Sequence, residues 1–203
     1  DAFVRNDDQR CYHCRSMRLS AMFDHAEKLG IDVVCDGTNA SDVGEGHRPG
    51  LRAVEELDAY SPLLANDITK DEVRDIAREY DISVAEKPSM ACLSSRIPTG
   101  LEVTEDRLSR IEKAERLLRT WGFEQFRVRD HDGLARIEVA EEEFDVALDP
   151  DFVRAARDHI ADLGFDHVTL DLHGYRTGSV SPDDSDGVAD IAPDPLDAEY
   201  PSG

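Results

Sequence analysis

Long apolar runs are absent from this 203-residue sequence. None approaches the roughly 20 residues that a membrane-spanning helix needs. The first residues, DAFVRNDDQR, contain no hydrophobic signal region either. The sequence therefore predicts a protein that works without a membrane, and we expect it in the cytoplasm.

Lysine is scarce, with four residues against 19 arginines, whereas aspartate (28) and glutamate (17) are abundant and the net charge is −22. Such a charge repels phosphate backbones and anionic lipids, which argues against nucleic acid or membrane as a partner. An anionic small molecule would need a local basic pocket. An Asp-rich, Lys-poor surface is typical of proteins kept soluble in a high-salt cytoplasm, so we expect a halophilic source.

Cysteine is also rare, and the four residues do not form the framework of a secreted disulfide protein. Two of them form the pair Cys11-x-x-Cys14. Thiolates at this spacing reach one metal ion or carry out redox chemistry in a reducing cytosol. The alternative is a chance pair of inert thiols. A second CxxC is missing, so a zinc ribbon is disfavoured.

Hydrophobic periodicity and turn residues predict alternating helices and strands. Thr69-x-x-Glu72 is a capping box that opens one of the helices, and Asp132-Gly133 is the turn of a β-hairpin. The Asp-, Pro- and Ser-rich end of the chain predicts a disordered tail. The expected helices are 16–29, 69–81, 104–121 and 150–163, and the expected strands are 31–35, 59–64, 167–172 and the two arms of the hairpin 126–140.

Two loops carry candidate site residues. The strand at 31–35 ends in Asp-Gly-Thr-Asn, where Asp36 and Asn39 suit a ligand loop at the edge of an open parallel sheet. The decapeptide ACLSSRIPTG (91–100) places Cys92 ahead of Ser94, Ser95 and Arg96. A free cysteine is often only a small buried hydrophobe. Its neighbours favour a reactive or ligating cysteine, with Arg96 beside the thiol or an anion.

The hairpin carries a basic stripe. Phe126, Val128, Ile137 and Val139 alternate with three arginines and a glutamate, so the two sets face opposite sides. One interpretation is a solvated face with cross-strand ion pairs; the other is an anion site built from guanidinium groups. Periodicity leaves both open. The residues of the stripe are Arg127, Arg129, Arg136 and Glu138.

Together the motifs resemble the ATP-dependent sacrificial sulfur transferases, the LarE family, over residues 5–179. The match rests on several motifs that occur in the family's order. They are RCYHCR (10–15), DGTNASD (36–42), RPGLRA (48–53), SPLL (61–64), TKDEVRDIARE (69–79), KPSMACLSSRIPTG (87–100), FRVRDHDGLARIEV (126–139) and LDLHGYRTGS (170–179).

The resemblance implies an α/β fold: a Rossmann-like PP-loop part with a doubly wound parallel sheet, followed by a smaller α/β part. Family members use ATP and Mg²⁺ to adenylylate a carboxylate of a pyridinium dicarboxylate mononucleotide. They then insert sulfur, making the thiocarboxylates of the nickel-pincer nucleotide, and we expect the other proteins of that synthesis as partners. Homo-oligomers are common in the family. The domains expected here are 1–100, the C-terminal portion of the PP-loop domain, 101–178, the smaller domain, and 179–203, the acidic tail.

The resemblance also implies roles for single residues. Cys92 matches the family's sulfur-supplying cysteine, and Ser95 and Arg96 lie beside it in the motif. Arg127, Arg129 and Glu138 match positions of the phosphate- and metal-binding site. In one branch the cysteine gives up its own sulfur and becomes dehydroalanine. In another, three cysteines hold a [4Fe–4S] cluster that leaves one iron open for a transferable sulfide; Cys11, Cys14 and Cys92 suit that branch, which we favour.

One departure from the family is clear: the phosphate loop of the SGGVDS type is missing, and Ser-Gly-Gly occurs nowhere in the chain. The chain begins where a family member is already past this loop, so we expect it to be a fragment. Two rival interpretations remain. One is a different PP-loop enzyme, such as a tRNA thiolase, which the acidic charge disfavours, or an NAD- or GMP-synthase-like amidotransferase. The other is a non-catalytic zinc- or cluster-binding module.

Overall fold

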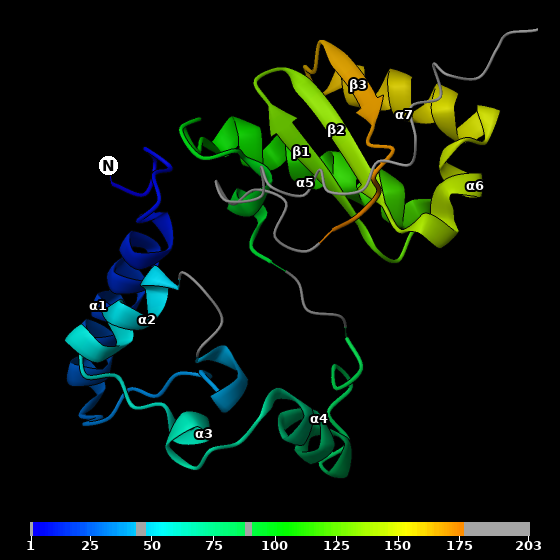
Figure 1. Ribbon diagram of the computed structural model, residues 1–203. Helices are drawn as coiled ribbons and strands as arrows, with labels where there is room; N and C mark the ends of the chain where they lie inside the picture. Colours follow the sequence, from blue (N-terminus) through cyan, green and yellow to red (C-terminus); the bar gives the residue numbers. More distant parts are fainter. Residues whose placement is uncertain (1, 44–47, 88–90, 177–203) are drawn as a thin grey trace, which may run out of the picture. The chain divides into compact units, whose positions relative to one another are not determined.

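The structure is a computed structural model that describes residues 2–43, 48–87 and 91–176 (Figure 1). The chain divides into two compact units. The first contains Asp1–Lys113 with Asp130–Asp132, and the second contains Ala114–Arg129 with Gly133–Gly203. The division falls inside helix α5 (Glu105–Thr120). The domain boundary expected near residue 100 and the disordered tail expected from 179 stay predictions, and the tail lies outside the described residues.

The first unit is built mainly from helices. Helices α1 (Arg10–Leu29) and α2 (Pro49–Glu56) pack side by side (Figure 1). Their apolar faces meet in a small core that also takes in Val34. The first unit also contains two short helices and two 3-10 turns. They are α3 (Pro62–Ala65), α4 (Lys70–Glu79), η1 (Ala40–Asp42) and η2 (Leu93–Arg96). The core consists of Leu19, Ala26, Val34 and Val54, with Phe23, Leu57 and Ala59 packed against it.

The cysteine pair lies within a helix. We expected a helix from residue 16, but α1 begins at Arg10 and includes Cys11 and Cys14 in its first turns. The segment RCYHCR at 10–15 has no apolar residue of the aliphatic kind that a helical periodicity argument uses, so the extension was not expected. Helix α1 ends as expected at Gly30, whose φ of 66° is a left-handed C-cap.

The two strands expected in this unit form only one isolated parallel bridge, between Cys35 and Tyr60. Within 31–35, Val34 is buried while Val33 is exposed. Residues 62–65 form α3 in place of a strand, because proline at the first helical position fixes a helical φ. The bridge has the direction expected for a parallel sheet. The doubly wound PP-loop sheet itself stays a prediction.

Helix α4 confirms the capping box. The Thr69 side chain accepts a hydrogen bond from the backbone N–H of Glu72, and the Glu72 carboxylate accepts one from Thr69 N. The Glu72 carboxylate also accepts a hydrogen bond from Thr69 Oγ1 at 2.8 Å, and the bonds from the Thr69 backbone N–H and hydroxyl lower the pKa of this carboxyl below its ordinary value. The helix begins one residue later and ends two residues earlier than expected.

The second unit contains a three-stranded sheet in the order β1-β2-β3. Strands β1 (Phe126–His131) and β2 (Leu134–Val139) form the expected hairpin. Its turn has positive φ at Asp132 (55°) and Gly133 (95°), as a type I′ turn requires. Strand β3 (His167–Leu170) pairs with β2 in parallel, with Leu134 opposite His167. The turn η3 (Glu141–Glu143) and helices α6 (Phe144–Ala147) and α7 (Pro150–Asp162) connect β2 to β3.

The core of the second unit lies between this sheet and the helices. The C-terminal part of α5 and α7 cover one face of the sheet (Figure 1). The apolar hairpin residues predicted to face a core are all buried. Leu118 of α5 and Ile160 of α7 are fully buried as well. The chain is therefore an α/β protein, as expected.

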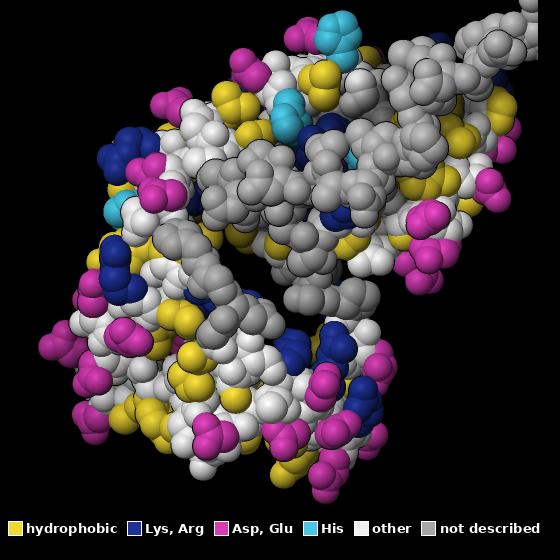
Figure 2. Space-filling view, in the orientation of Figure 1, with side chains coloured by type: hydrophobic (Ala, Val, Ile, Leu, Met, Phe, Trp, Pro, Cys, Tyr) yellow, Lys and Arg dark blue, Asp and Glu magenta, His cyan; other side chains and the backbone are white. Residues whose placement is uncertain are grey.

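The surface is acidic. Figure 2 shows acidic side chains spread over the visible face, with fewer Lys and Arg side chains between them. In the part of the chain that the structure describes, no helix combines the length and apolar character needed to cross a bilayer.

Candidate functional site

Cys92 stands at the start of a tight turn. It is exposed, and it occupies the N-cap position of η2. Its Sγ lies 3.2 Å from the hydroxyl oxygen of Ser94. Its carbonyl oxygen accepts hydrogen bonds from Ser95 N at 3.0 Å and from Ser95 Oγ at 2.7 Å. The thiol is therefore accessible while the backbone beneath it is held.

Arg96 supports this turn from inside. Its side chain is almost fully buried, at 1% exposure. The guanidinium donates to the carbonyl oxygens of Ala91 and Cys92, at 3.0 and 3.1 Å, and to Ser95 Oγ at 3.1 Å. Arg96 thus binds the backbone on both sides of the thiol-bearing residue. The structure places the three residues expected to be catalytic, Cys92, Ser95 and Arg96, in one turn.

Asp36 is the centre of a second polar network. Its carboxylate accepts hydrogen bonds from Ser61 Oγ (2.5 Å), from Thr38 Oγ1 (2.7 Å) and from Arg15, with which it forms an ion pair. Burial alone would raise the pKa of this carboxyl. The hydrogen bonds from Ser61 and Thr38 and the charge of Arg15 outweigh burial, so the pKa lies below its ordinary value of 3.8. The carboxylate is ionised at neutral pH.

Asn39, the other residue expected in the ligand loop, caps a turn. It is 5% exposed, and its Oδ1 accepts from Ser41 N at 3.1 Å. Its own N–H donates to Asp42 Oδ2 at 3.1 Å. Asp36 and Asn39 therefore shape the loop through internal hydrogen bonds, and their contact with a substrate stays a prediction.

Two pockets adjoin this loop. The smaller, of about 420 Å³, has Cys11, Arg15, Thr38, Arg48 and Gly50 in its wall. Cys11, the first residue of the cysteine pair, and Arg15, the partly exposed partner of Asp36, therefore line the same pocket. Because Arg15 is paired with Asp36 and Arg48 with Asp42 (2.7 Å), the charges around this pocket largely cancel.

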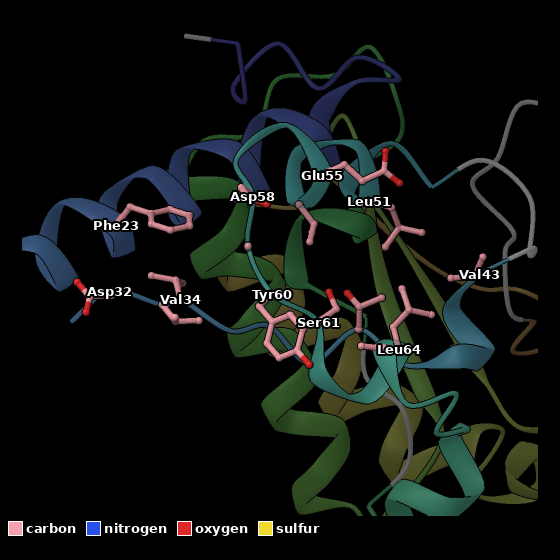
Figure 3. A pocket seen from close by; sticks show the side chains of 15 residues that line it. Phe23, Asp32, Val34, Val43, Leu51, Glu55, Asp58, Tyr60, Ser61 and Leu64 are labelled. Carbon is pink, nitrogen blue, oxygen red and sulfur yellow. The ribbon is translucent and has the colours of Figure 1, made fainter.

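The larger pocket, of about 720 Å³, also has Thr38 in its wall. Figure 3 shows the ring of Tyr60 between Val34 and Leu64, with Ser61 beside it. Apolar side chains dominate, and the acidic groups Asp32, Glu55 and Asp58 are also in the wall. This pocket suits an apolar or aromatic group and disfavours an anion, since its charged wall residues are all acidic.

The three cysteines expected to hold a cluster are on different elements. Cys11 and Cys14 lie on α1, and Cys92 lies at η2. Among the described residues, no group of three or more His, Cys, Asp or Glu side chains is arranged to hold a metal ion. The arrangement does not fit a cluster as it stands, and the cluster stays a prediction.

The hairpin arginines are engaged with carboxylates and a tyrosine. Arg129 and Glu138 are 5% and 1% exposed and form a two-point ion pair, with Arg129 Nη2 2.9 Å from Glu138 Oε2. Arg136 adds a contact of 2.8 Å to Glu138. Arg127 donates to Tyr175 Oη at 2.9 Å and stacks on its ring. A cross-strand ion pair is therefore present in the stripe, buried rather than solvated, and an anion site built from these arginines stays a prediction.

The sequence of this chain is similar to those of three known proteins. No protein-family model matches the chain. It is 37% identical over 179 residues to an uncharacterized protein of Synechocystis sp., covering 88% of this chain and 66% of that protein. It is 34% identical over 177 residues to an uncharacterized protein of Methanocaldococcus jannaschii, covering 87% and 68%. It is 35% identical over 182 residues to the pyridinium-3,5-bisthiocarboxylic acid mononucleotide synthase of Lactiplantibacillus plantarum, covering 89% and 64%.

The named relative supports the LarE-like family that the motifs indicate. This chain spans about two thirds of the length of these relatives. The similarity extends along nearly the whole of this chain, so it includes the Cys92 turn, the Asp36 loop and the hairpin.

Sequence reasoning missed the contacts of two residues in this chain. Ser94 was expected, with Ser95 and Arg96, to position an anionic partner, but its contact with the thiol was not foreseen, although its hydroxyl oxygen lies 3.2 Å from the sulfur. Asn6 lies far from the decapeptide in sequence, yet it is fully buried against it. A buried asparagine has no periodic signal, so only the folded chain could reveal it.

Proposed function

We propose that this chain carries the sulfur-delivering part of an enzyme of nickel-pincer nucleotide synthesis. Its substrate is an adenylylated carboxylate of a pyridinium dicarboxylate mononucleotide, and its product is the thiocarboxylate. The named LarE-like relative, a pyridinium-3,5-bisthiocarboxylic acid mononucleotide synthase, supports this substrate class. A thiol enzyme of this kind belongs in a reducing compartment such as the cytosol.

The observation that carries the proposal is the construction of the Cys92 turn. A nucleophile must be open to its substrate, and its backbone must be fixed so that the reacting atoms meet in a productive geometry. Cys92 is exposed, whereas Arg96 beneath it is buried and binds the flanking carbonyl groups. Ser94 Oγ can donate a hydrogen bond to the Cys92 thiolate.

In the single-use route the atoms balance without an oxidant or reductant. The Cys92 thiolate attacks the activated carboxyl carbon and forms a C–S bond, and AMP leaves with the electron pair of the C–O bond. Water or buffer base then takes the Cα proton of Cys92, a Cα=Cβ double bond forms, and the Cβ–Sγ bond breaks with its electron pair staying on sulfur. The products are a thiocarboxylate and a dehydroalanine at position 92.

The residues that the structure describes do not contain a complete site for the expected cofactors. Adenylylation needs ATP and Mg²⁺, but the Ser-Gly-Gly loop is missing from the sequence. Among the described residues, no three His, Cys, Asp or Glu side chains lie close enough together to hold a metal ion. We therefore derive no step through ATP, Mg²⁺ or a [4Fe–4S] cluster. The substrate-binding roles of Arg127, Arg129, Glu138, Asp36 and Asn39 remain part of the proposal.

The decisive experiment supplies the acyl-adenylate ready-made, so that sulfur delivery is tested without ATP. Mass spectrometry of the protein should show a thioester at Cys92 or a loss of the mass of H₂S from it. Cys92→Ala should abolish both signals, whereas Cys35→Ala, which removes another exposed thiol, should leave them unchanged. An unmodified Cys92 in wild-type protein that also contains no iron or acid-labile sulfide would overturn the proposal.

A second measurement separates the two sulfur sources. Anaerobically purified protein with a reusable cluster should contain about four irons and at least four acid-labile sulfides. Changing Cys11, Cys14 or Cys92 to alanine should remove them. Protein without iron that converts Cys92 to dehydroalanine uses its own sulfur once.

A further inference from the structure

The loop that carries Cys92 is fastened at its far end by a single buried side chain. Asn6 is 0% exposed, and its amide nitrogen donates to the carbonyl oxygens of Ile97 (3.2 Å), Pro98 (2.8 Å) and Leu101 (2.7 Å). Its backbone carbonyl accepts from Gly100 N at 2.9 Å. The two N–H hydrogens of one side chain thus serve three carbonyl oxygens at the end of the decapeptide and just beyond it, with the Ile97 contact the longest.

The backbone of Asn6 is shaped for this role. Its φ is 54°, in the left-handed region that asparagine tolerates better than most residues. The neighbouring Val4 carbonyl accepts from Val103 N at 2.9 Å. The N-terminal segment therefore lies along the segment before α5 (Figure 1). Buried carbonyl groups that lose their donor cost stability, so this contact favours one loop conformation.

Arg10 extends the anchor to the thiol end of the loop. Its Nη1 donates to Asn6 Oδ1 and, at 3.0 Å, to the carbonyl oxygen of Ser94. The hydroxyl of the same Ser94 lies 3.2 Å from Cys92 Sγ. A continuous chain of contacts therefore runs from Asn6 through Arg10 and Ser94 to the sulfur.

We propose that Asn6 and Arg10 are positioning residues that hold the Cys92 loop in the conformation from which the thiol reacts. Arg10 directly precedes Cys11, so the same anchor joins the first turn of α1 to the Cys92 loop. The reaction assigned to the Cys92 thiol rests on the proposed function, whereas the anchoring of the loop does not. The anchoring of the loop is a property of this fold that can be measured by itself.

The first test measures backbone hydrogen exchange in the whole chain. In Asn6→Ala and Arg10→Ala, the amides of Ser95, Ile97, Gly100 and Val103 should exchange at least about tenfold faster. The amides of the hairpin strands should not change. Matched controls are Asn66→Ala, which removes an exposed amide that donates to the Pro62 carbonyl, and Arg18→Ala, which removes an exposed arginine of α1. Unchanged exchange in the loop would overturn the anchor.

The second test separates orientation from thiol chemistry. With the ready-made acyl-adenylate, the maximal rate of thioester formation should fall about 10- to 100-fold in Arg10→Ala, at an unchanged half-saturating concentration. Alkylation of Cys92 by iodoacetamide, which needs no defined orientation, should change less than about threefold. Arg10→Lys, which keeps a cationic donor, should restore part of the rate.

The outcomes are distinguishable. Equal losses in thioester formation and alkylation would mean a damaged thiol environment and would overturn positioning. A wild-type chain that forms no thioester and contains no iron or acid-labile sulfide would overturn the proposed function, and the exchange test would still decide the anchor. Should Asn6→Ala fail to fold, the Arg10 pair of variants carries both tests.

Discussion

The two units each contain an arginine–carboxylate pair, and the pairs differ in what they leave open. Arg15 and Asp36 in the first unit have side chains 34% and 8% exposed, and Arg15 lines a pocket together with Cys11. Arg129 and Glu138 in the second unit are 5% and 1% exposed. The first pair can meet a ligand on its open side. The second is closed in the described structure.

The difference shows that burial, more than residue type, decides what an arginine–carboxylate pair can do. Both pairs satisfy a charged group inside the fold, because an unpaired buried charge costs several kcal/mol. Only a pair with an accessible guanidinium can also bind an anion without first being broken. For Arg129 and Glu138 to serve a ligand, as the resemblance implies, the ligand would have to replace the contact between them.

The largest effect is expected from Glu138→Gln. Removing one partner of a buried pair leaves the charge of Arg129 poorly compensated. The free energy of unfolding should therefore fall by about 3–5 kcal/mol. Urea unfolding followed by the fluorescence of Trp121 checks this, because Trp121 belongs to the second unit and contacts Phe152. Glu142→Gln, at an exposed glutamate close in sequence, should change the midpoint little. If Glu138→Gln leaves the free energy of unfolding unchanged, the contact between Arg129 and Glu138 contributes little to stability, and a ligand could replace it.

A smaller effect, about 1–3 kcal/mol, is expected from Asp36→Asn, which removes a hydrogen-bonded charge from the open pair. The pKa of Asp36 is lower in the folded chain than its ordinary 3.8. Its stabilisation is therefore present in full above about pH 4 and is lost as the pH falls through the folded value.

Two measurements check this prediction. Thermal melts of both proteins between pH 7 and 3 should show a constant difference that shrinks only at the acid end. Exchange of the Tyr60 amide, which donates to Val34, should accelerate in the variant at neutral pH. A difference that grows toward low pH would contradict the assigned direction of the shift.

The smallest effect is expected from Arg136→Gln. Arg136 is 28% exposed, and it contacts Glu138 from the rim at 2.8 Å and Asp171 at 3.5 Å. A partly solvated contact of this kind contributes about 0.5–1.5 kcal/mol. The same Trp121-monitored urea curves provide the measurement. A loss as large as that of Glu138→Gln would mean that Arg136, and not Arg129, is the essential partner.

Local signals in the sequence predicted the second unit well. The alternation of Phe126, Val128, Ile137 and Val139 and the Asp132-Gly133 turn located the hairpin, because a two-residue turn and a period of two depend on neighbouring residues only. Helices α5 and α7 follow from the same kind of signal. The first unit was harder, since a parallel strand has no short-range partner, and 31–35 forms one bridge where a strand was expected.

The candidate site divides in the same way. The sequence by itself determined the α/β class, the LarE-like motifs and the grouping of Cys92, Ser95 and Arg96 in one loop, since these depend on composition, periodicity and contiguous residues. Only the tertiary structure decided that Asp36 is held by Arg15 and Ser61, and that Glu138 closes over Arg129. It alone placed Asn6 against the cysteine loop, 91–95 residues away in sequence. Hydrogen bonds between distant residues depend on how the chain packs, and packing leaves no periodic mark in the sequence.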